Sequence, residues 1–285
     1  MTFSIAYHTI TWRDEFAAAL RDIAAAGYTA FETFTLPLRV AESWHGYVER
    51  ISQAYLETPD TYLETDSYAT AHELTACASR LDLTLASMYC SGQFIDPTLV
   101  DAEIRAILRA ARFVRAAGCR HLVVGGGMNA HGTYTDDDYA RLSEAVHAVG
   151  RGCREIGIIA CYHPHSGTMV ETAAQLERFC AETDPELIAL APDVAHLVRG
   201  GADPVATLRR YADRVQYLHL KDIRDDEFIE LGEGTVDLPG VMGTLREIGY
   251  SGWAVVELDD TTRTPLESAA ISYRYLRDQL GIDEI

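Results

Sequence analysis

Four short apolar segments in the second half of the chain each lead to a residue that could bind a metal ion. They end at His163, Asp193, His219 and Glu257, and a helical pattern fills the gap between one segment and the next. The carboxyl ends of parallel strands in a barrel all meet at one face, so side chains that follow successive strands converge there. Imidazole and carboxylate ligands together suit a divalent cation such as Mn, Co, Fe or Zn. Each residue alone would fit an ordinary buried position, but the four together predict a metal centre.

Two of these segments carry a second polar residue beside the first. His163 and His165 are two residues apart, so on a strand both side chains face the same side. His219 and Lys221 share a face in the same way, and Asp222 follows on the opposite face. We expect either a catalytic lysine or an ion pair of Lys221 with Asp222 that orients His219.

Such a centre supports one kind of chemistry with three possible outcomes. A divalent cation on a carbonyl and a neighbouring hydroxyl polarises the C=O bond and stabilises the enediolate formed when a base removes the adjacent proton. Return of the proton to the other face is epimerisation, and its transfer to the neighbouring carbon is isomerisation. Loss of a β-hydroxyl is dehydration. The candidate acid and base residues are Glu32, Lys221, His196 and His165. Glu32 also fits a solvent-facing carboxylate at a strand end.

The elements that must position these residues alternate between strand and helix patterns along the whole chain. The first half contributes four expected strands, and the four ligand-bearing segments complete eight strand–helix units, which is the number that a (β/α)8 TIM barrel needs. We therefore predict an α/β fold with a single barrel domain over residues 1–285. A doubly wound sheet is the alternative, weakened because no GxGxxG follows the first strand. The expected strands of the first half are Phe3–Tyr7, Thr29–Phe34, Leu83–Tyr89 and Arg120–Val124.

One segment interrupts the alternation. Thr35–Ser67 is too long for an ordinary connection and is predicted to be an insertion after the second strand. A lid, a subunit contact and a packed loop are all compatible with it.

Aromatic and polar residues at the other strand ends are candidates for binding substrate. His8 and Trp12 follow the first expected strand, Tyr89 ends the third and Arg224 follows the seventh, while His165 stands beside His163. An aromatic plate beside polar groups suits a sugar or polyol, which is apolar on one face. Trp12 and Tyr89 fit ordinary core positions equally well. No compact Arg/Lys cluster is evident, which favours an unphosphorylated substrate.

Composition excludes several classes of protein. The formal net charge is −19, from 43 acidic and 24 basic residues, which argues against nucleic-acid partners and anionic membranes because both need a basic face. The start of the chain lacks the pattern of a signal peptide, and no apolar run approaches the roughly 20 residues of a membrane helix. The six cysteines form no CxxC pair, which indicates reduced thiols and a cytoplasmic protein.

Several phrases of the second half resemble the xylose isomerase-like TIM barrel family of sugar isomerases and epimerases. That family typically binds one divalent metal through Glu, Asp, His and Glu on strands five to eight. The resemblance implies that Asp193, His219 and Glu257 are ligands and that His163 replaces the first Glu, with Glu171 as a distant alternative. The phrases are Asp193-Val194-Ala195-His196, His219-Leu220-Lys221-Asp222 and Val255-Val256-Glu257.

A further phrase, Tyr162-His163-Pro164-His165-Ser166-Gly167-Thr168, is similar to the inosose (2-keto-myo-inositol) dehydratase branch of that family. The sequence thus predicts a metal-dependent isomerase or epimerase acting on a keto-sugar or polyol, with one divalent ion (Mn, Co, Mg, Fe or Zn) and Mn favoured. The alternative is a lyase that dehydrates inosose or eliminates from a 3-keto-glycoside.

Two other functions compete with these predictions. A DNA-repair phosphodiesterase of the endonuclease IV type would need a multi-metal cluster and a basic DNA-binding face, which the charge of −19 opposes. A non-catalytic sugar-binding barrel would bind ligand without turnover. Homo-oligomers are common in the family, so the chain is also a candidate homo-oligomer.

Overall fold

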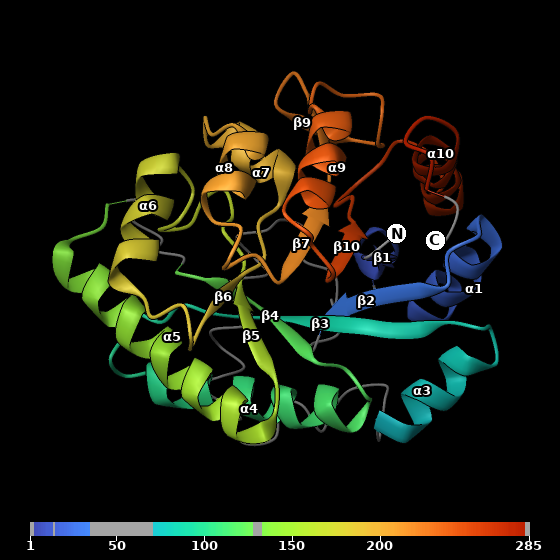
Figure 1. Cartoon of the computed structure of the whole chain (residues 1–285). Coiled ribbons are helices and arrows are strands. Elements are labelled where there is room, and N and C mark those ends of the chain that lie inside the picture. Colours follow the sequence, from blue (N-terminus) through green and yellow to red (C-terminus); the bar gives the residue numbers. More distant parts are fainter. Residues whose placement is uncertain (1–2, 14, 35–70, 128–132, 283–285) are drawn as a thin grey trace.

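Eight parallel strands form the centre of the molecule, with the helices around them (Figure 1). The computed structural model describes residues 3–13, 15–34, 71–127 and 133–282. The strands are β1 (Ser4–His8), β2 (Ala30–Phe34), β3 (Thr84–Gly92), β4 (His121–Gly126), β5 (Ile159–Tyr162), β6 (Ala189–Leu190), β7 (Tyr217–Leu220) and β10 (Trp253–Val256). The predicted insertion at 35–67 lies outside the described residues.

The sheet closes on itself. Its strand order is β6-β5-β4-β3-β2-β1-β10-β7, and two parallel bridges, Leu190 to Val215 and Asp193 to His219, join the two ends. The backbone N–H of Leu190 donates to the carbonyl of Arg214 at 2.7 Å across this seam. The predicted (β/α)8 TIM barrel is therefore confirmed.

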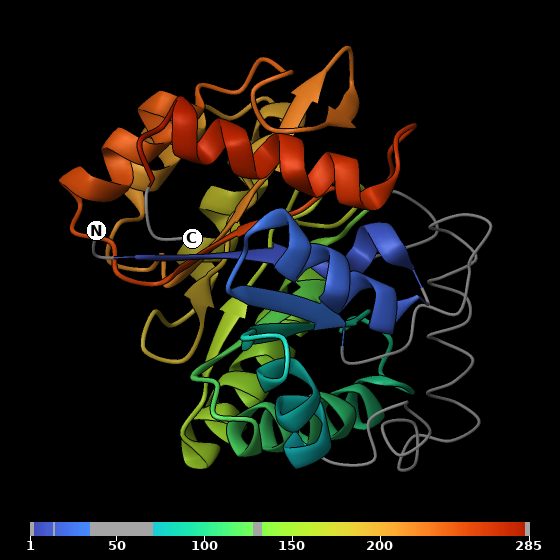
Figure 2. The ribbon, with the colours of Figure 1, turned by 90° about the vertical axis from the view of Figure 1, so that its right-hand side faces the viewer.

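Several helices start at a residue whose side chain caps them. Thr135 and Asp138 form a reciprocal capping box at the start of α5, and Gly157 ends that helix in the left-handed conformation. The last helix packs against α1 beside β1, which completes the ring (Figure 2). The helices are α1 (Phe16–Ala26), α3 (Ala71–Ser79), α4 (Val100–Ala116), α5 (Asp136–Ile156), α6 (Ala173–Glu182), α7 (Val194–Arg199), α8 (Pro204–Arg210), α9 (Leu238–Glu247) and α10 (Pro265–Asp278), with a 3-10 turn at Thr9–Trp12.

A small hairpin departs from the alternation expected from the sequence. Strands β8 (Asp222–Arg224) and β9 (Glu227–Ile229) pair antiparallel directly after β7. Asp225 and Asp226 form the two-residue turn, and both have positive φ, as such hairpin turns require. The sequence did not predict the hairpin because the segment is short and charged.

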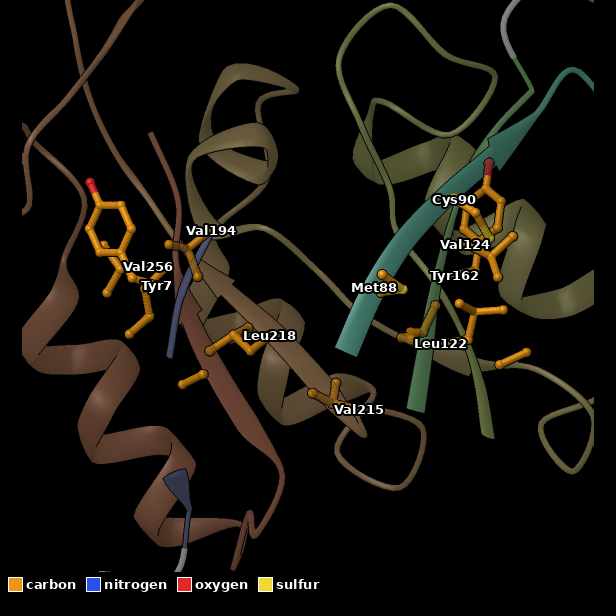
Figure 3. Close-up of a cluster of buried hydrophobic side chains, with 14 of the residues drawn as sticks. Tyr7, Met88, Cys90, Leu122, Val124, Tyr162, Val194, Val215, Leu218 and Val256 are labelled. Carbon is orange, nitrogen blue, oxygen red and sulfur yellow. The ribbon is translucent and has the colours of Figure 1, made fainter. Parts of the chain in front are cut away.

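The strands separate two cores, because successive side chains face opposite sides of the sheet. The outer core lies between the strands and the helices, and Figure 3 shows part of it, including Tyr7, Met88, Leu122 and Leu218. The inner core fills the barrel with mostly small residues and a few aromatic ones: Ala6, Ala30, Phe34, Ala86, Tyr89, Val123, Cys161, Ala189, Ala191, Tyr217 and Val255.

Candidate metal centre

The four predicted ligands lie together at the carboxyl ends of β5, β6, β7 and β10, and all four are buried. One ligand atom each of His163, Asp193 and His219 lies within 4.8 Å of the others. Glu257 joins them, because its Oε2 is 2.6 Å from Nδ1 of His219. The convergence expected from parallel strands is therefore present.

Among the described residues, three of these candidate ligands carry a buried atom for which no hydrogen bond of good geometry is present. The atoms are Oδ2 of Asp193, Nδ1 of His219 and Oε2 of Glu257. Oδ1 of Asp193, in contrast, caps helix α7 and accepts the backbone N–H groups of Ala195 and His196 at 2.8 and 3.0 Å. Nδ1 of His219 and Oε2 of Glu257 face each other at 2.6 Å, and Oδ2 of Asp193 lies 3.5 Å from Nζ of Lys221. Buried nitrogen and oxygen atoms gathered in this way fit a divalent cation.

Hydrogen bonds on the side of each ring that faces away from the other candidate ligands fix which nitrogen of His163 and of His219 faces them. Nδ1 of His163 lies 3.0 Å from the carbonyl oxygen of Ala191. A carbonyl only accepts, so the proton is assigned to Nδ1 and the lone pair to Nε2. Nε2 of His219 lies 3.0 Å from Oε2 of Glu32, which assigns its proton to Nε2 and leaves Nδ1 for the ion. Metal-binding histidines commonly have such outer partners.

A second group of three histidines overlaps the first and is less suited to a metal ion. One ring nitrogen each of His163, His165 and His196 also lies within 4.8 Å of the others. Nδ1 of His196, however, accepts the backbone N–H of Ser166 at 3.2 Å. A neutral His196 therefore carries its proton on Nε2, which makes that nitrogen a donor and not a ligand.

Lys221 is fully buried beside the ligands. Its Nζ lies 2.9 Å from Oδ2 of Asp259, 3.3 Å from Oε1 of Glu257 and 3.5 Å from Oδ2 of Asp193. Burial opposes its charge, but these three carboxylates outweigh burial and raise the pKa of Lys221 above its usual value. Lys221 is therefore an ammonium group in the site.

One interpretation of the sequence paired Lys221 with Asp222. In the described structure the partners of Lys221 are the three carboxylates above, and Asp222 has a different role. Its carboxylate accepts four backbone N–H groups at 2.9–3.0 Å and so ties the loop between β9 and α9 to β8. The donors belong to Ile223, Gly232, Gly234 and Val236.

The histidines of the site fall into two electrostatic classes. Burial lowers the pKa of His163, His165 and His196, so these rings are neutral. Burial opposes the charged form of His219 too, but the carboxylates of Glu32 and Glu257 outweigh it and raise the pKa of His219 to about 10. The ring of His219 can therefore carry a proton on Nδ1 as well as on Nε2, and a bound cation would take the place of the proton on Nδ1.

Of the residues predicted to bind substrate, the structure brings His8, Tyr89 and His165 to this site. The ring of His8 lies 6.1 Å from that of His219, and the ring of Tyr89 lies 5.7 Å from that of His163. The ring of His165 lies 3.7 Å from that of His196.

Trp12 and Arg224 lie elsewhere. The indole N–H of Trp12 donates to Asp22 of α1 at 2.8 Å and its ring packs on Tyr7, which places it in the outer core. Arg224 lies on the β8–β9 hairpin, where its exposed side chain donates to the carbonyl of Glu233 at 2.9 Å. The 3-10 turn after β1 turns Trp12 away from the barrel mouth.

Three residues at or beside the site were not found from the sequence. Asp259 follows Glu257 at the alternate spacing that marked His163 and His165, so the same pattern could have indicated it. Phe228 of the hairpin lies with its ring 4.8 Å from that of His196 and 4.5 Å from Nζ of Lys221. Tyr217 donates its hydroxyl to Glu32 at 3.0 Å. Nothing in the sequence signals these last two contacts, because they join distant segments.

Glycines of β4 shape the wall beside His163. A Cβ atom on Gly125 would lie 1.9 Å from the hydroxyl of Tyr89. Gly125 thus leaves room for the Tyr89 ring in the barrel.

Comparison with known proteins agrees with this geometry. A family model described as xylose isomerase-like TIM barrel matches residues 20–279. The chain belongs to the xylose isomerase-like TIM barrel family. Among the relatives of this barrel, an inosose dehydratase of Geobacillus kaustophilus is 31% identical over 237 residues, which cover 71% of this chain and 77% of the relative.

Two solved structures share the barrel at lower identity. A sugar phosphate isomerase/epimerase from Parabacteroides distasonis has a TM-score of 0.74 and 21% identity, with 97% of this chain and 94% of that chain covered. The IOLI protein with a bound zinc atom has a TM-score of 0.72 and 14% identity, with 97% of each chain covered. At these identities the likeness supports the fold alone. No described helix of this xylose isomerase-like barrel has the length and apolar character to cross a membrane.

Proposed function

We propose that the protein is a divalent-metal-dependent lyase that removes water from a cyclic keto-polyol of the inosose type. The observation that carries this proposal is the 31% identity over 71% of the chain to an inosose dehydratase. It favours the lyase, the alternative in the sequence analysis, over the isomerase or epimerase that the sequence analysis put first.

The residues that would hold the metal are His163, Asp193, His219 and Glu257. When bound, the ion would act as a Lewis acid on the substrate carbonyl and so acidify the adjacent C–H group. Two imidazoles and two carboxylates suit Mn, Co, Fe or Zn better than Mg, which prefers oxygen ligands. The zinc atom in the structure of the IOLI protein is compatible with this ligand preference.

The hydrogen bonds of the two remaining histidines support different roles. Nδ1 of His165 lies 2.6 Å from the carbonyl oxygen of Ser166, which assigns the proton to Nδ1 and leaves Nε2 able to accept one. The proton of His196 is assigned to Nε2, a buried atom without a hydrogen-bond partner among the described residues. We assign the base to His165 and the acid to His196.

In this mechanism the bonds change at two neighbouring carbons. His165 Nε2 takes the proton from the carbon next to the carbonyl, and the electron pair of that C–H bond forms a C=C bond. The C–O bond at the next carbon breaks, and its hydroxyl leaves as water with the proton from His196 Nε2. Lys221 stays protonated and offsets the negative charge of Asp193 and Glu257, 3.5 and 3.3 Å away.

An isomerase or epimerase would use the same base without loss of the hydroxyl. The isomerase/epimerase from Parabacteroides distasonis with the same barrel keeps this as the second candidate. Proton NMR in heavy water separates the two, with the protein loaded with Mn, Co, Zn or Mg and given inosose, other keto-sugars or aldoses.

An unsaturated product from inosose supports the lyase. Deuterium next to the carbonyl in a new saturated sugar would replace it with the isomerase or epimerase. Absence of both reactions in metal-loaded protein would contradict both and favour a binding barrel.

The location of the protein is also a proposal. All six cysteines are free in the structure, which fits a reducing compartment such as the cytoplasm.

A further inference from the structure

A carboxylate from the first half of the barrel reaches across its interior to a metal ligand of the second half. Glu32 is on β2 and His219 is on β7, and β1 and β10 stand between these two strands in the sheet. Oε2 of Glu32 lies 3.0 Å from Nε2 of His219 and accepts the hydroxyl of Tyr217 at 3.0 Å. The three side chains form a continuous Tyr217–Glu32–His219 relay inside the barrel.

Burial of the Glu32 carboxylate lowers the free energy of unfolding unless partner groups compensate it. Glu32 has no exposed surface, and a buried carboxylate is unfavourable without partners that compensate its desolvation. Among the ion pairs of residues 3–13, 15–34, 71–127 and 133–282, its only partner is His219. Tyr217 has no exposed surface either, and the one hydrogen bond that its hydroxyl donates goes to Glu32.

We infer that Glu32 is a positioning residue, held by Tyr217, which fixes the His219 ring so that Nε2–H points to Glu32 and Nδ1 points to Asp193 and Glu257. The inference rests on the metal site of the proposed function, and it replaces the acid or base role predicted for Glu32 from the sequence. Nδ1 of His219 then faces Oε2 of Glu257 at 2.6 Å, on the side where the ion would bind.

One atom of the relay could serve a different role, that of a catalytic base. Oε1 of Glu32 is buried and has no hydrogen-bond partner in the part of the chain that the structure describes. A base acting through Oε1 would leave metal binding untouched when Glu32 is replaced, whereas a positioning residue would not. Metal affinity in the absence of substrate therefore distinguishes the two.

The experiment measures the dissociation constants of Co²⁺ and Mn²⁺ by competition with a chelating dye for the whole chain and for the variants Glu32→Gln and Tyr217→Phe. We expect Glu32→Gln to weaken metal binding by roughly 10- to 100-fold, the usual effect of losing an outer partner of a ligand. Tyr217→Phe should weaken it less, because the carboxylate stays. Glu103→Gln is the matched control, since Glu103 is equally buried but accepts the N–H groups of Gln93 and Phe94.

A second readout follows the ring itself. In the Co²⁺-loaded protein, Nε2–H of His219 should give a paramagnetically shifted proton NMR signal that exchanges slowly with water. In Glu32→Gln this proton should exchange faster, while circular dichroism of the metal-free variant shows whether the fold is kept.

Wild-type metal affinity and wild-type exchange in both Glu32→Gln and Tyr217→Phe would overturn the inference and leave the metal site standing. Normal affinity with lost turnover in Glu32→Gln would overturn it in favour of a base at Oε1. Equal weakening in Glu103→Gln would also overturn the inference, because it would show that loss of any buried carboxylate weakens metal binding. A wild-type chain that binds neither ion would overturn the metal site as well.

Discussion

The two halves of the barrel contribute to the site in different ways. The four candidate ligands follow β5, β6, β7 and β10, whereas β1 to β4 supply groups that touch or support them, such as His8, Glu32 and Tyr89. In the proposed site the second half thus carries the donor atoms, and the first half sets their orientation and the shape of the pocket. Substitutions in the two halves should therefore fail in different ways.

The largest effect is expected in the second half. His219→Ala and Glu257→Gln should each weaken metal binding by more than the roughly 10- to 100-fold typical of outer partners, because each removes a donor atom itself. Metal content after dialysis, measured by mass spectrometry, checks this, with the exposed His72→Ala as control. Normal metal content in both variants would refute the ligand assignment.

An effect on stability is expected at His121, the first residue of β4. Burial, helped by Arg120, lowers the pKa of His121 to about 4 from an ordinary 6.5. The unfolded chain then binds a proton that the folded chain does not, so stability present above pH 6.5 is lost as the pH falls towards 4.

At pH 5 this amounts to about 2 kcal/mol for one histidine with such a shift. Urea unfolding at pH 7 and pH 5 checks it: His121→Asn should lose less stability between the two than the wild type. The exposed His72→Asn should behave as wild type, and an equal slope in His121→Asn would exclude this residue as a cause.

A smaller effect is expected where the first half shapes the pocket. Gly125→Ala would place a Cβ 1.9 Å from the hydroxyl of Tyr89 and so displace that ring, which lies 5.7 Å from the ring of His163. We expect a loss of roughly 10-fold in kcat/KM with metal content unchanged, because small misplacements in an active site are costly. Steady-state kinetics and metal analysis test this together.

The matched control is Gly243→Ala in α9, where a Cβ would meet no atom within 4 Å. That variant should keep its activity. Loss of metal in Gly125→Ala would contradict this prediction, because Gly125 would then affect metal binding as well as the shape of the pocket.

The smallest effect is expected from the hairpin. Phe228 is half-buried and faces His196 and Lys221. Phe228→Ala should raise KM by roughly 3- to 10-fold, the range expected for one aromatic contact, with less change in kcat. Phe228→Tyr, which keeps the ring, should stay near wild type; a fall in kcat alone would instead place Phe228 in the chemical step.

The same division explains how much could be predicted from the sequence. His163, Asp193, His219 and Glu257 each follow a recognisable apolar strand, so a local pattern and the geometry of parallel strands suffice to bring them together. The eight-strand barrel was predictable for the same reason.

The contacts of the first half were not predictable in this way. Glu32 and His219 are 187 residues apart, and nothing near either residue indicates the partner. Trp12 was assigned to the pocket because it follows a strand, but the 3-10 turn sends it to Asp22 on the outside of the barrel. The β8–β9 hairpin is too short and too charged for periodicity to reveal it.

Asp193 divides its two oxygens between two tasks, and this constrains how the protein can evolve. Oδ1 caps helix α7, which carries His196, while Oδ2 faces the other ligands. Asparagine caps a helix as well as aspartate does but offers no second anionic oxygen. Serine would keep the cap and lose the reach to the ion. A substitution at position 193 can therefore abolish metal binding while the cap of α7 is kept. A descendant that has lost its metal could still keep its fold.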